Sequence, residues 1–342
     1  MTRPTIHDLA KAAGVSVSTV NRIVGGAGGV REATMRHVRD VAAEIGFYGL
    51  GAIDSRLSAA RPRYRFGVLL QQPTRTFYQN LAQALRAATE RPGGSVVELQ
   101  IEFLDELAPQ NIAARLLALG EACQAVAVVA AVHPLITQTV ETLQQRGVPV
   151  FALISPLGAT GNVHYVGLDN WKVGRTAAWA VAHMCAVPAK LGILVGNHRY
   201  RCQEMNESGF RSYFREYAPA FTLLEPLSTF ESSAVAGEMT ERLLREHPDL
   251  AGLYVAGGGI SGALAALRGS GRAGKIVIVG YELMDNTRAA LIDGTLTLVI
   301  SHPLPRLSDE LLLGMIRACD DGSERRAYSC VLPFDIYTRE NI

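Results

Sequence analysis

The stretch AAGVSVSTVNRIV, residues 12–24, decides how the N-terminal part of this chain folds. It contains four valines and one isoleucine, and such β-branched residues favour strands. Their spacing indicates a helix instead, because apolar residues recur at intervals of three and four at Val17, Val20, Ile23 and Val24. Ser16 stands just before them as an N-cap. The stretch is therefore predicted to be a helix whose other face is polar.

Two more short helices surround this one. An amphipathic run precedes it, opening with a Thr5/Asp8 pair close to a capping box, and Gly14 separates the two helices. This arrangement predicts a helix-turn-helix. After the Gly-rich turn at residues 25–29, a third helix is expected to end at Gly46, with a buried side made of Thr34, Val38, Val41, Ala42 and Ile45. Three helices in about 45 residues make a very small core, so we expect a module that serves a larger body.

Composition limits the classes of protein. The chain has 342 residues, 48% of them hydrophobic, which is enough for two or three packed units. It has no apolar run of the roughly 20 residues that a membrane helix needs, and no secretory segment at its start. A soluble cytoplasmic protein with no membrane partner is expected. The five cysteines form no CxxC pair, so neither a zinc site nor a disulfide framework is expected. No other metal and no cofactor is expected.

Charge is unevenly distributed along the chain. Residues 1–65 hold ten Lys/Arg and five Asp/Glu, whereas the remainder holds 23 and 27. A basic head on a mildly acidic body points to nucleic acid at one end, although an ordinary solvated surface would give the same modest excess.

The head has a specific resemblance. TIHDLAKAAGVSVSTVNRIVGG and the following VREATMRHVRDVAAEIGF resemble the headpiece of the LacI/GalR family of bacterial transcription repressors, through T-I-x-D-L-A, A-G-V-S-x-x-T-V and I-G-F. A helical hairpin with no role on DNA is the alternative. The resemblance implies that the second helix enters the major groove of double-stranded operator DNA.

The resemblance also implies roles for single residues. Val17, Ser18 and Arg22 occupy positions where bases are read, and the Arg22 fork can donate two hydrogen bonds to guanine. Contacts to phosphate are expected from Thr5, Ser16 and Thr19. Asn21 stands where the family usually has serine, and Gly25 where asparagine is common, so phosphate contacts there depart from the family pattern.

A hinge follows the head in YGLGAIDSRLSAARPRYR, residues 48–65. Family members usually have Pro-Asn and an A-R-x-L segment here, and this chain lacks the Pro-Asn. We place a minor-groove wedge at Leu57, with Arg56 and Arg61 near phosphates. A flexible basic linker is the alternative. Pro62 marks a boundary, which gives a DNA-binding domain at 1–48, a hinge at 49–63 and an effector-binding and dimerisation domain at 64–342.

The body alternates apolar strands with amphipathic helices, which predicts parallel sheets covered by helices on both faces. The expected strands lie at 66–70, 96–104, 125–131, 149–153, 190–195, 221–230, 251–256 and 275–280. Two such series imply two similar α/β lobes with a ligand cleft between them, because ligands bind at the carboxyl ends of parallel strands.

The body is similar to the periplasmic-binding-protein-like core that LacI/GalR proteins carry. That fold implies three crossings between lobes, expected near 155–162, 295–302 and 320–330. Lobe 1 would then hold residues 64–158 and 300–322, and lobe 2 residues 160–297 and 328–342.

A rival interpretation rests on GGGISG, residues 257–262. Gly257, Gly259 and Gly262 fit G-x-G-x-x-G before a helix, and Glu282 follows twenty residues later, as in a dinucleotide-binding fingerprint. However, three βα units of the second lobe precede this one, whereas a Rossmann domain begins with it. No set of catalytic residues accompanies it.

Interpreted as a ligand cleft, the strand ends supply the candidate effector-binding residues. They are Phe77, Tyr78, His133, Asp169, Asn170, Asn197, Arg199, Arg201, Asn206, Gly258, Glu282 and His302. Asn206 replaces a common family arginine, and Gly258 with Gly259 replaces a common Asn-Asp, so the usual sugar is not expected in its usual pose. Arg75, Arg199 and Arg201 would favour an acidic or phosphorylated carbohydrate.

The sequence thus predicts a transcriptional regulator, a repressor that binds a near-palindromic operator as a homodimer and responds to a small sugar or sugar derivative. The C-terminus shows no leucine heptads, which favours a dimer over a tetramer. An NAD-dependent enzyme, or a solute-binding protein with an incidental helical head, is the alternative.

Overall fold

The computed structural model describes residues 3–91, 94–320 and 327–342. Internal contacts divide the chain into two compact units. The first, the head, is Met1–Tyr64 with Pro92–Val97, and the second, the body, is Arg65–Arg91 with Glu98–Ile342.

The head holds four helices: α1 (Ile6–Ala12), α2 (Val17–Gly25), α3 (Glu32–Glu44) and α4 (Leu50–Ala60). The predicted caps are confirmed. Thr5 and Asp8 form a capping box at α1, and the Ser16 hydroxyl accepts the Thr19 N–H at 3.1 Å at the start of α2. Gly14 adopts a left-handed φ of 64° in the turn between the two helices, a conformation that favours glycine.

A single small core holds the head together. Its fully or nearly fully buried members are Leu9, Ala10, Ala13, Val20, Ile23, Val38, Ala42, Phe47 and Ile53. Ile53 belongs to α4, so the segment expected to be a hinge contributes a buried side chain to the head. An Arg39–Asp54 ion pair of 2.9 Å also joins α3 to α4, and its hydrogen bond raises the pKa of Arg39.

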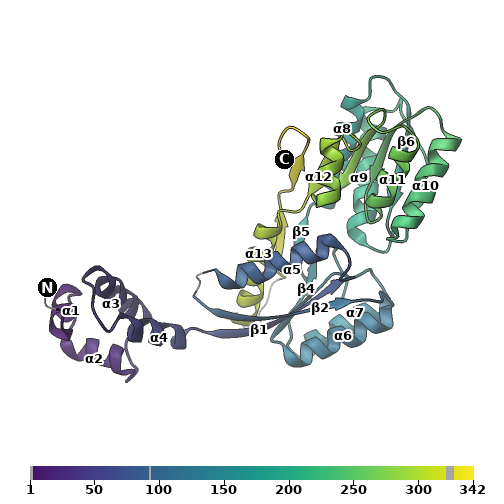
Figure 1. Ribbon diagram of the computed structural model, residues 1–342. Helices are drawn as coiled ribbons and strands as arrows, with labels where there is room; N and C mark the ends of the chain where they lie inside the picture. The colour runs from purple at the N-terminus through teal and green to yellow at the C-terminus, as the bar shows by residue number, and fades with distance from the viewer. Residues whose placement is uncertain (1–2, 92–93, 321–326) are drawn as a thin grey trace. The chain divides into compact units, whose positions relative to one another are not determined.

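Lobe 1 of the body is built on a six-stranded sheet of order β12-β5-β4-β3-β1-β2. The pairings β1–β3, β3–β4, β4–β5 and β5–β12 are parallel. Figure 1 shows α5 and α13 on one side of this sheet and α6 and α7 on the other. The elements are β1 (Arg63–Gln71), α5 (Thr76–Glu90), β2 (Val96–Leu104), α6 (Pro109–Ala122), β3 (Ala125–Val128), α7 (Pro134–Gln145), β4 (Val150–Leu153), β5 (His164–Leu168), α13 (Leu304–Asp320) and β12 (Ser329–Leu332).

Lobe 2 has a second sheet, of order β13-β11-β10-β9-β6-β7, with β8 also paired to β6. Its pairings are parallel except for the antiparallel edge strand β13, which the sequence analysis did not expect. The elements are α8 (Asn170–Met184), β6 (Lys190–Val195), α9 (Arg201–Tyr217), β7 (Thr222–Leu223), β8 (Leu227–Ser228), α10 (Ser233–Glu246), β9 (Leu250–Val255), α11 (Ile260–Gly269), β10 (Val277–Tyr281), α12 (Asp285–Ile292), β11 (Leu298–Ser301) and β13 (Asp335–Tyr337). The single strand expected at 221–230 is instead β7 and β8, interrupted around Pro226, which cannot donate to a ladder.

The crossings between the lobes lie later than expected. β5 still belongs to the lobe 1 sheet and α8 starts at Asn170, so the first crossing is at 168–170 and not at 155–162. The second falls at 302–303, between β11 and α13. The third falls at 333–334, between β12 and β13, and not at 320–330. The predicted lobe boundaries at 158, 160, 297, 300, 322 and 328 are therefore wrong, because the short strands β5, β12 and β13 were missed and β11 was divided between the lobes.

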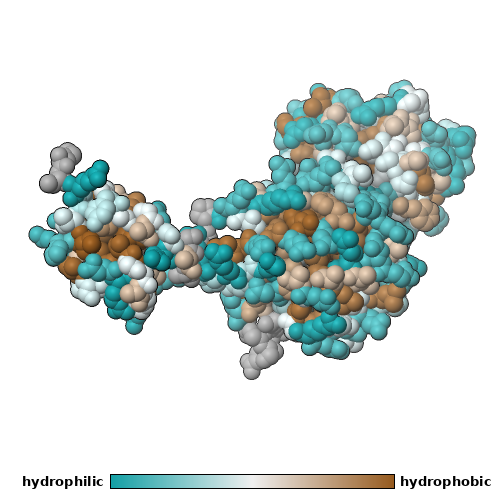
Figure 2. All heavy atoms as spheres, turned by 60° about the horizontal axis from the view of Figure 1, so that its bottom comes forward, coloured by the Kyte–Doolittle hydropathy of each residue, from teal (hydrophilic) through white to brown (hydrophobic). Residues whose placement is uncertain are grey.

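The face of the molecule in Figure 2 is mainly polar. Hydrophobic residues form separate patches within a mostly hydrophilic face in Figure 2. In the described ranges, no helix combines the length and the apolar content needed to cross a bilayer.

Candidate functional site

Helix α2 presents a polar face to solvent. Ser16, Ser18, Asn21 and Arg22 are exposed, and Val17 and Thr19 are half-buried. Val20 and Ile23 on the opposite face are buried in the head core, so they fix which way the polar face points. A narrow polar helix face of this kind can enter the major groove of DNA.

Two of the residues expected to contact phosphate also build the caps. The Ser16 hydroxyl lies 2.8 Å from that of Thr19 at the start of α2. At α1 the Thr5 hydroxyl and the Thr5 N–H both donate to Asp8 Oδ2, at 2.7 and 2.8 Å. These two hydrogen bonds hold the pKa of Asp8 below its ordinary value.

Arg22 lies in the last turn of α2 and packs against the Gly-rich turn. Its Nη2 donates to the Gly28 carbonyl at 2.8 Å, and a Cβ at Gly29 would lie 2.2 Å from that nitrogen. The turn favours glycine at Gly29 because of its left-handed φ of 73°, whereas the exposed end of Arg22 could move aside for a Cβ. The guanidinium is exposed, so exchanging one neutral carbonyl for another acceptor costs little.

The expected wedge lies on α4. Leu57 is half-buried against the head core, and Arg56 is exposed with its guanidinium beside Gly26. Both side chains are thus carried by a helix that is anchored to the head through Ile53.

The body contains a cavity of about 260 Å³ between its lobes, at the carboxyl ends of the parallel strands. This is slightly below the roughly 300–1,000 Å³ of typical ligand pockets, which suits a small ligand. Lobe 1 contributes residues that follow β1, β3 and β4, and lobe 2 contributes residues that follow β6, β8, β9, β10 and β11.

Six of the twelve expected effector residues line this cavity, namely Phe77, Tyr78, Asn206, Gly258, Glu282 and His302. Each follows a strand directly or stands on the helix that does. Burial raises the pKa of Tyr78 well above its ordinary value, and it raises the pKa of Cys202, which also lines the cavity, to about 12. Both groups are therefore neutral near pH 7.

The other six lie outside the cavity lining. Three of them form local hydrogen bonds, two are exposed and one is buried. His133 and Asp169 cap α7 and α8 by accepting the N–H groups of Leu135 and Lys172. Asn197 accepts the Arg199 N–H at 2.9 Å. Arg199 and Arg201 are exposed.

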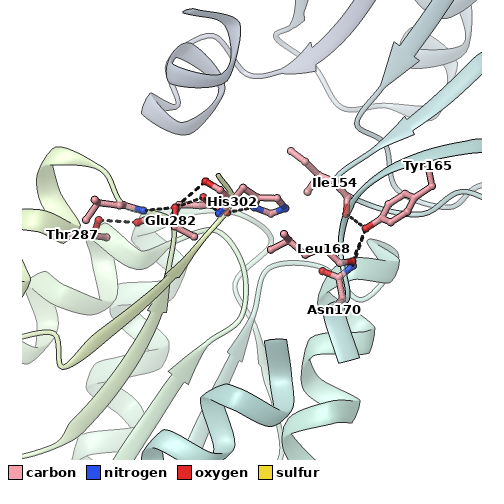
Figure 3. A network of polar contacts seen from close by, with 9 residues as sticks. Ile154, Tyr165, Leu168, Asn170, Glu282, Thr287 and His302 are labelled. Carbon is pink, nitrogen blue, oxygen red and sulfur yellow. Dashed lines mark hydrogen bonds and ion pairs between the residues drawn. The ribbon is translucent and has the colours of Figure 1, made fainter. Parts of the chain in front are cut away.

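Asn170, the remaining residue, belongs to the first crossing. It is 1% exposed, and its Nδ2 donates to the Tyr165 hydroxyl at 3.3 Å and to the Leu168 carbonyl at 3.2 Å. The Tyr165 hydroxyl also lies within hydrogen-bond distance of the Ile154 carbonyl, as Figure 3 shows. This network fixes the segment through which the chain passes between the lobes.

Glu282 and His302 form a buried pair beside the cavity (Figure 3). His302 Nδ1 lies 2.5 Å from Glu282 Oε1, and the other carboxylate oxygen accepts from the Ser301 hydroxyl and the His302 N–H. Among the described residues, His302 Nε2 is buried without a hydrogen-bond partner. It is therefore available to a polar group of a ligand.

The glycines of GGGISG have packing roles. A Cβ at Gly262 would lie 1.7 Å from the Ser233 carbonyl on α10, and Gly259 has a left-handed φ of 100° at the start of α11. Glu282 is already bonded to three donors and does not stand free for a ribose. This geometry disfavours the dinucleotide interpretation.

Sequence reasoning missed several polar residues of the cavity, among them Gln71, Gln203, Glu231 and Asn286. Gln71 ends β1 and Glu231 follows β8, so the strand-end criterion that found Glu282 applies to them as well. Arg75, which was considered for its charge, lines the cavity and forms a 2.6 Å ion pair with Glu231.

The backbone around the cavity is locally strained. Ile154, Glu231 and Glu282 line it with positive φ values of 68°, 63° and 66°, although none of them is glycine. Such strain costs of order 1–3 kcal/mol per residue and clusters at ligand sites.

Both parts of the chain match known families. Residues 5–49 match the family described as bacterial regulatory proteins, lacI family, and residues 66–307 match a periplasmic binding protein domain. The chain is 23% identical over 345 residues to the HTH-type transcriptional regulator GntR of Pseudomonas aeruginosa, covering 99% of this chain and 96% of that protein.

Two further proteins resemble the body. The D-ribose/D-allose-binding protein of Pseudomonas aeruginosa is 30% identical over 135 residues, which are 39% of this chain and 41% of that protein. The structure of a solute-binding protein from Actinobacillus succinogenes with bound D-allose has a TM-score of 0.72 at 17% identity, covering 82% of this chain and 98% of that one. Over residues 66–307 the chain therefore belongs to the periplasmic binding protein domain family, and it carries at residues 5–49 a domain of the lacI family of bacterial regulatory proteins.

Proposed function

We propose that this protein is a repressor that binds a near-palindromic DNA operator as a homodimer in the cytoplasm and responds to a small sugar in the body cavity. The proposal of DNA binding rests on the exposed polar face of α2, which points to solvent because Val20 and Ile23 on the opposite face are buried in the head core. On a two-fold-symmetric site, two heads would double the available base contacts.

At the DNA interface, Arg22 would read guanine with its fork, while Val17 and Ser18 would meet neighbouring bases. Thr5, Ser16, Thr19 and Asn21 would contact phosphates. We assign Leu57 of α4 to the minor groove as a wedge, with Arg56 at the adjacent backbone. Leu57 is half-buried against the head core, which also holds Val20 and Ile23 of α2. This packing supports the placement, because it attaches α4 to the same core as the recognition helix.

The sugar part rests on the position and lining of the cavity. Aromatic side chains at Phe77 and Tyr281 can pack against C–H faces, and Asn286 and His302 can bond hydroxyls. The relatives that bind D-ribose or D-allose support this class of ligand. A sugar can change DNA binding only through its differential affinity for two lobe arrangements, typically about 1–3 kcal/mol.

The test is selection of bound duplexes from a random pool by the full-length chain and by R22A. We expect the native chain to enrich a two-fold-symmetric site, with affinity falling steeply as salt rises. R22A should lose about 1–3 kcal/mol of discrimination at one base pair of each half-site.

The matched control is R36A, which removes an exposed arginine of α3 that pairs with Glu32. Its base preference should remain that of the native chain. Equal preference in R22A and the native chain would refute the assignment of base readout, and no enriched site with or without added sugars would refute the DNA function.

A further inference from the structure

One ion pair spans the two lobes at the cavity. Arg75 stands in lobe 1 between β1 and α5, and Glu231 stands in lobe 2 after β8, 156 positions later. Arg75 Nη1 donates to Glu231 Oε2 at 2.6 Å, and its Nη2 donates to the Glu231 backbone carbonyl. The two side chains are 22% and 9% exposed, so the pair is largely removed from water.

Neighbouring glutamine side chains hydrogen-bond both members of this ion pair. Gln203 Nε2 donates to Glu231 Oε1 at 2.6 Å, and Gln72 Oε1 accepts from Arg75 Nε at 2.6 Å. Each oxygen of the Glu231 carboxylate thus accepts one hydrogen bond from a neighbour, and such added hydrogen bonds stabilise a buried pair.

Glycines make room for the carboxylate. A Cβ at Gly258 would lie 2.1 Å from Glu231 Oε2, and one at Gly196 would lie 1.9 Å from Oε1. Gly258 is one of the two glycines that replace a common Asn-Asp of the family, so this departure has a physical reason. The space that a side chain would fill is occupied by Glu231.

The pair also limits the positive charge of the cavity, which is lined by the Glu282 carboxylate as well. Arg75 is the only lysine or arginine among the described residues that line it, and its charge is balanced by Glu231. Arg199 and Arg201, which the sequence analysis considered for an acidic ligand, lie outside the lining. A ligand carboxylate or phosphate would have to displace Glu231, at the large cost of unpairing a buried charge.

We propose that the Arg75–Glu231 pair is a latch that joins the lobes in the absence of effector and makes the cavity selective for an uncharged sugar. Three other hydrogen bonds between the lobes act beside it. Gln71 Nε2 donates to the Tyr200 hydroxyl at 2.6 Å, the Val132 N–H to the Arg199 carbonyl at 2.8 Å, and the Cys202 N–H to the Ser155 hydroxyl at 3.4 Å. The selectivity rests on the proposed function of the cavity, whereas the joining of the lobes is measurable without ligand or DNA.

The first experiment measures amide hydrogen exchange of the full chain without ligand. In R75Q, E231Q and G258A, exchange at residues 72–77 and 229–232 should rise on the order of tenfold, the loss expected for one charged hydrogen bond. R268Q is the matched control, because Arg268 pairs with Asp293 within lobe 2. G258A keeps both charges, so it tests the latch even if a charge variant fails to fold. Unchanged exchange in all three variants would overturn the latch.

The second experiment measures calorimetric binding of D-glucose, D-galactose, D-ribose and D-allose, and of D-glucuronate and D-galacturonate. The native chain should prefer the neutral sugars, and E231Q, which frees Arg75, should gain about tenfold in affinity for the acids. Tighter binding of an acid to the native chain, or no difference between the native chain and E231Q toward acids, would overturn the selectivity. Failure of operator selection would leave both results standing, so the two proposals fail separately.

Discussion

The two lobes share one architecture but pack their helices in different ways. In lobe 2, glycines let helix backbones touch: a Cβ at Gly174 of α8 would lie 1.9 Å from the Asn206 carbonyl of α9, and one at Gly209 would lie 2.3 Å from the Trp171 carbonyl. In lobe 1, a Cβ at Gly120 of α6 would meet the Leu143 side chain of α7 at 2.2 Å. A side-chain end can move aside, whereas a backbone cannot.

This difference explains why lobe 2 keeps glycine inside its helices. Each helical glycine costs about 1 kcal/mol relative to alanine. This helix-propensity cost is offset only where the glycine lets two helices approach closely and the added van der Waals contacts stabilise the fold by more than about 1 kcal/mol. Lobe 2 should therefore tolerate change at its helix interfaces less than lobe 1 does.

The largest effect is expected for G262A. Its Cβ would lie 1.7 Å from the Ser233 carbonyl, so α10 and α11 must separate, at the upper end of the roughly 1–3 kcal/mol that overpacking costs, or beyond it. Both tryptophans, Trp171 and Trp179, stand on α8 of lobe 2, so tryptophan fluorescence follows this lobe. The midpoint of thermal unfolding by fluorescence should fall on the order of 5–10 °C.

The matched control is G269A at the end of the same helix, where the added Cβ meets nothing within 4 Å. It should keep the native midpoint or raise it. If G262A and G269A had the same midpoint of thermal unfolding, separating the helices of lobe 2 would cost little free energy of unfolding.

A smaller effect is expected for G120A in lobe 1. Leu143 can shift, and alanine gains helix propensity of about 1 kcal/mol, so stability should stay within about 1 kcal/mol of the native value. Circular dichroism follows both lobes and fluorescence follows lobe 2, so any shift should appear in the first signal alone. A loss as large as that of G262A would contradict the contrast between the lobes.

The smallest effect is expected for E216Q. Arg175 of α8 and then Ser212 bond Glu216 of α9, and they hold its pKa below the ordinary 4.5. A carboxyl whose pKa is depressed by folding stabilises above its unfolded pKa, and this stabilisation is lost as pH falls through the folded value. E216Q should therefore unfold at a slightly lower temperature than the native chain at pH 7, with the gap closing below pH 4.5.

The pH series also tests the reason for the contrast. If backbone contact dominates the α8–α9 interface, the E216Q shift stays at every pH below that of G174A, whose Cβ would lie 1.9 Å from the Asn206 carbonyl of α9. A larger shift for E216Q would instead make the exposed ion pair the main link between these helices.

The regular parts of the fold could be predicted from the sequence. The strands β1, β3, β6 and β9 are continuous apolar runs, and the spacing of Val17, Val20 and Ile23 identified α2. The edge strands β12 and β13 are short and partly exposed, with no such run. β12 pairs with β5, more than 150 positions away, and β13 pairs with β11 across the whole of α13, so no local pattern reveals either strand.

The candidate site likewise has residues that the sequence predicts and residues that it does not. Glu282 and His302 follow apolar strands directly, so the strand-end criterion placed them at the cavity. The same criterion also selected His133 and Asp169, because a helix N-cap after a strand looks identical in sequence. The Arg75–Glu231 pair could not be predicted, since neither residue indicates a partner on the other lobe.

The placement of β12 beside β5 has a consequence for synthesis on the ribosome. β5 is complete at Leu168, but its edge partner ends at Leu332, about 160 residues later, or roughly 10–30 s at 5–20 residues per second. Lobe 2 can assemble most of its sheet in that interval while lobe 1 waits with an open strand edge. The nascent chain is thus most exposed to mispairing at β5, which is the segment where a chaperone would have most to protect.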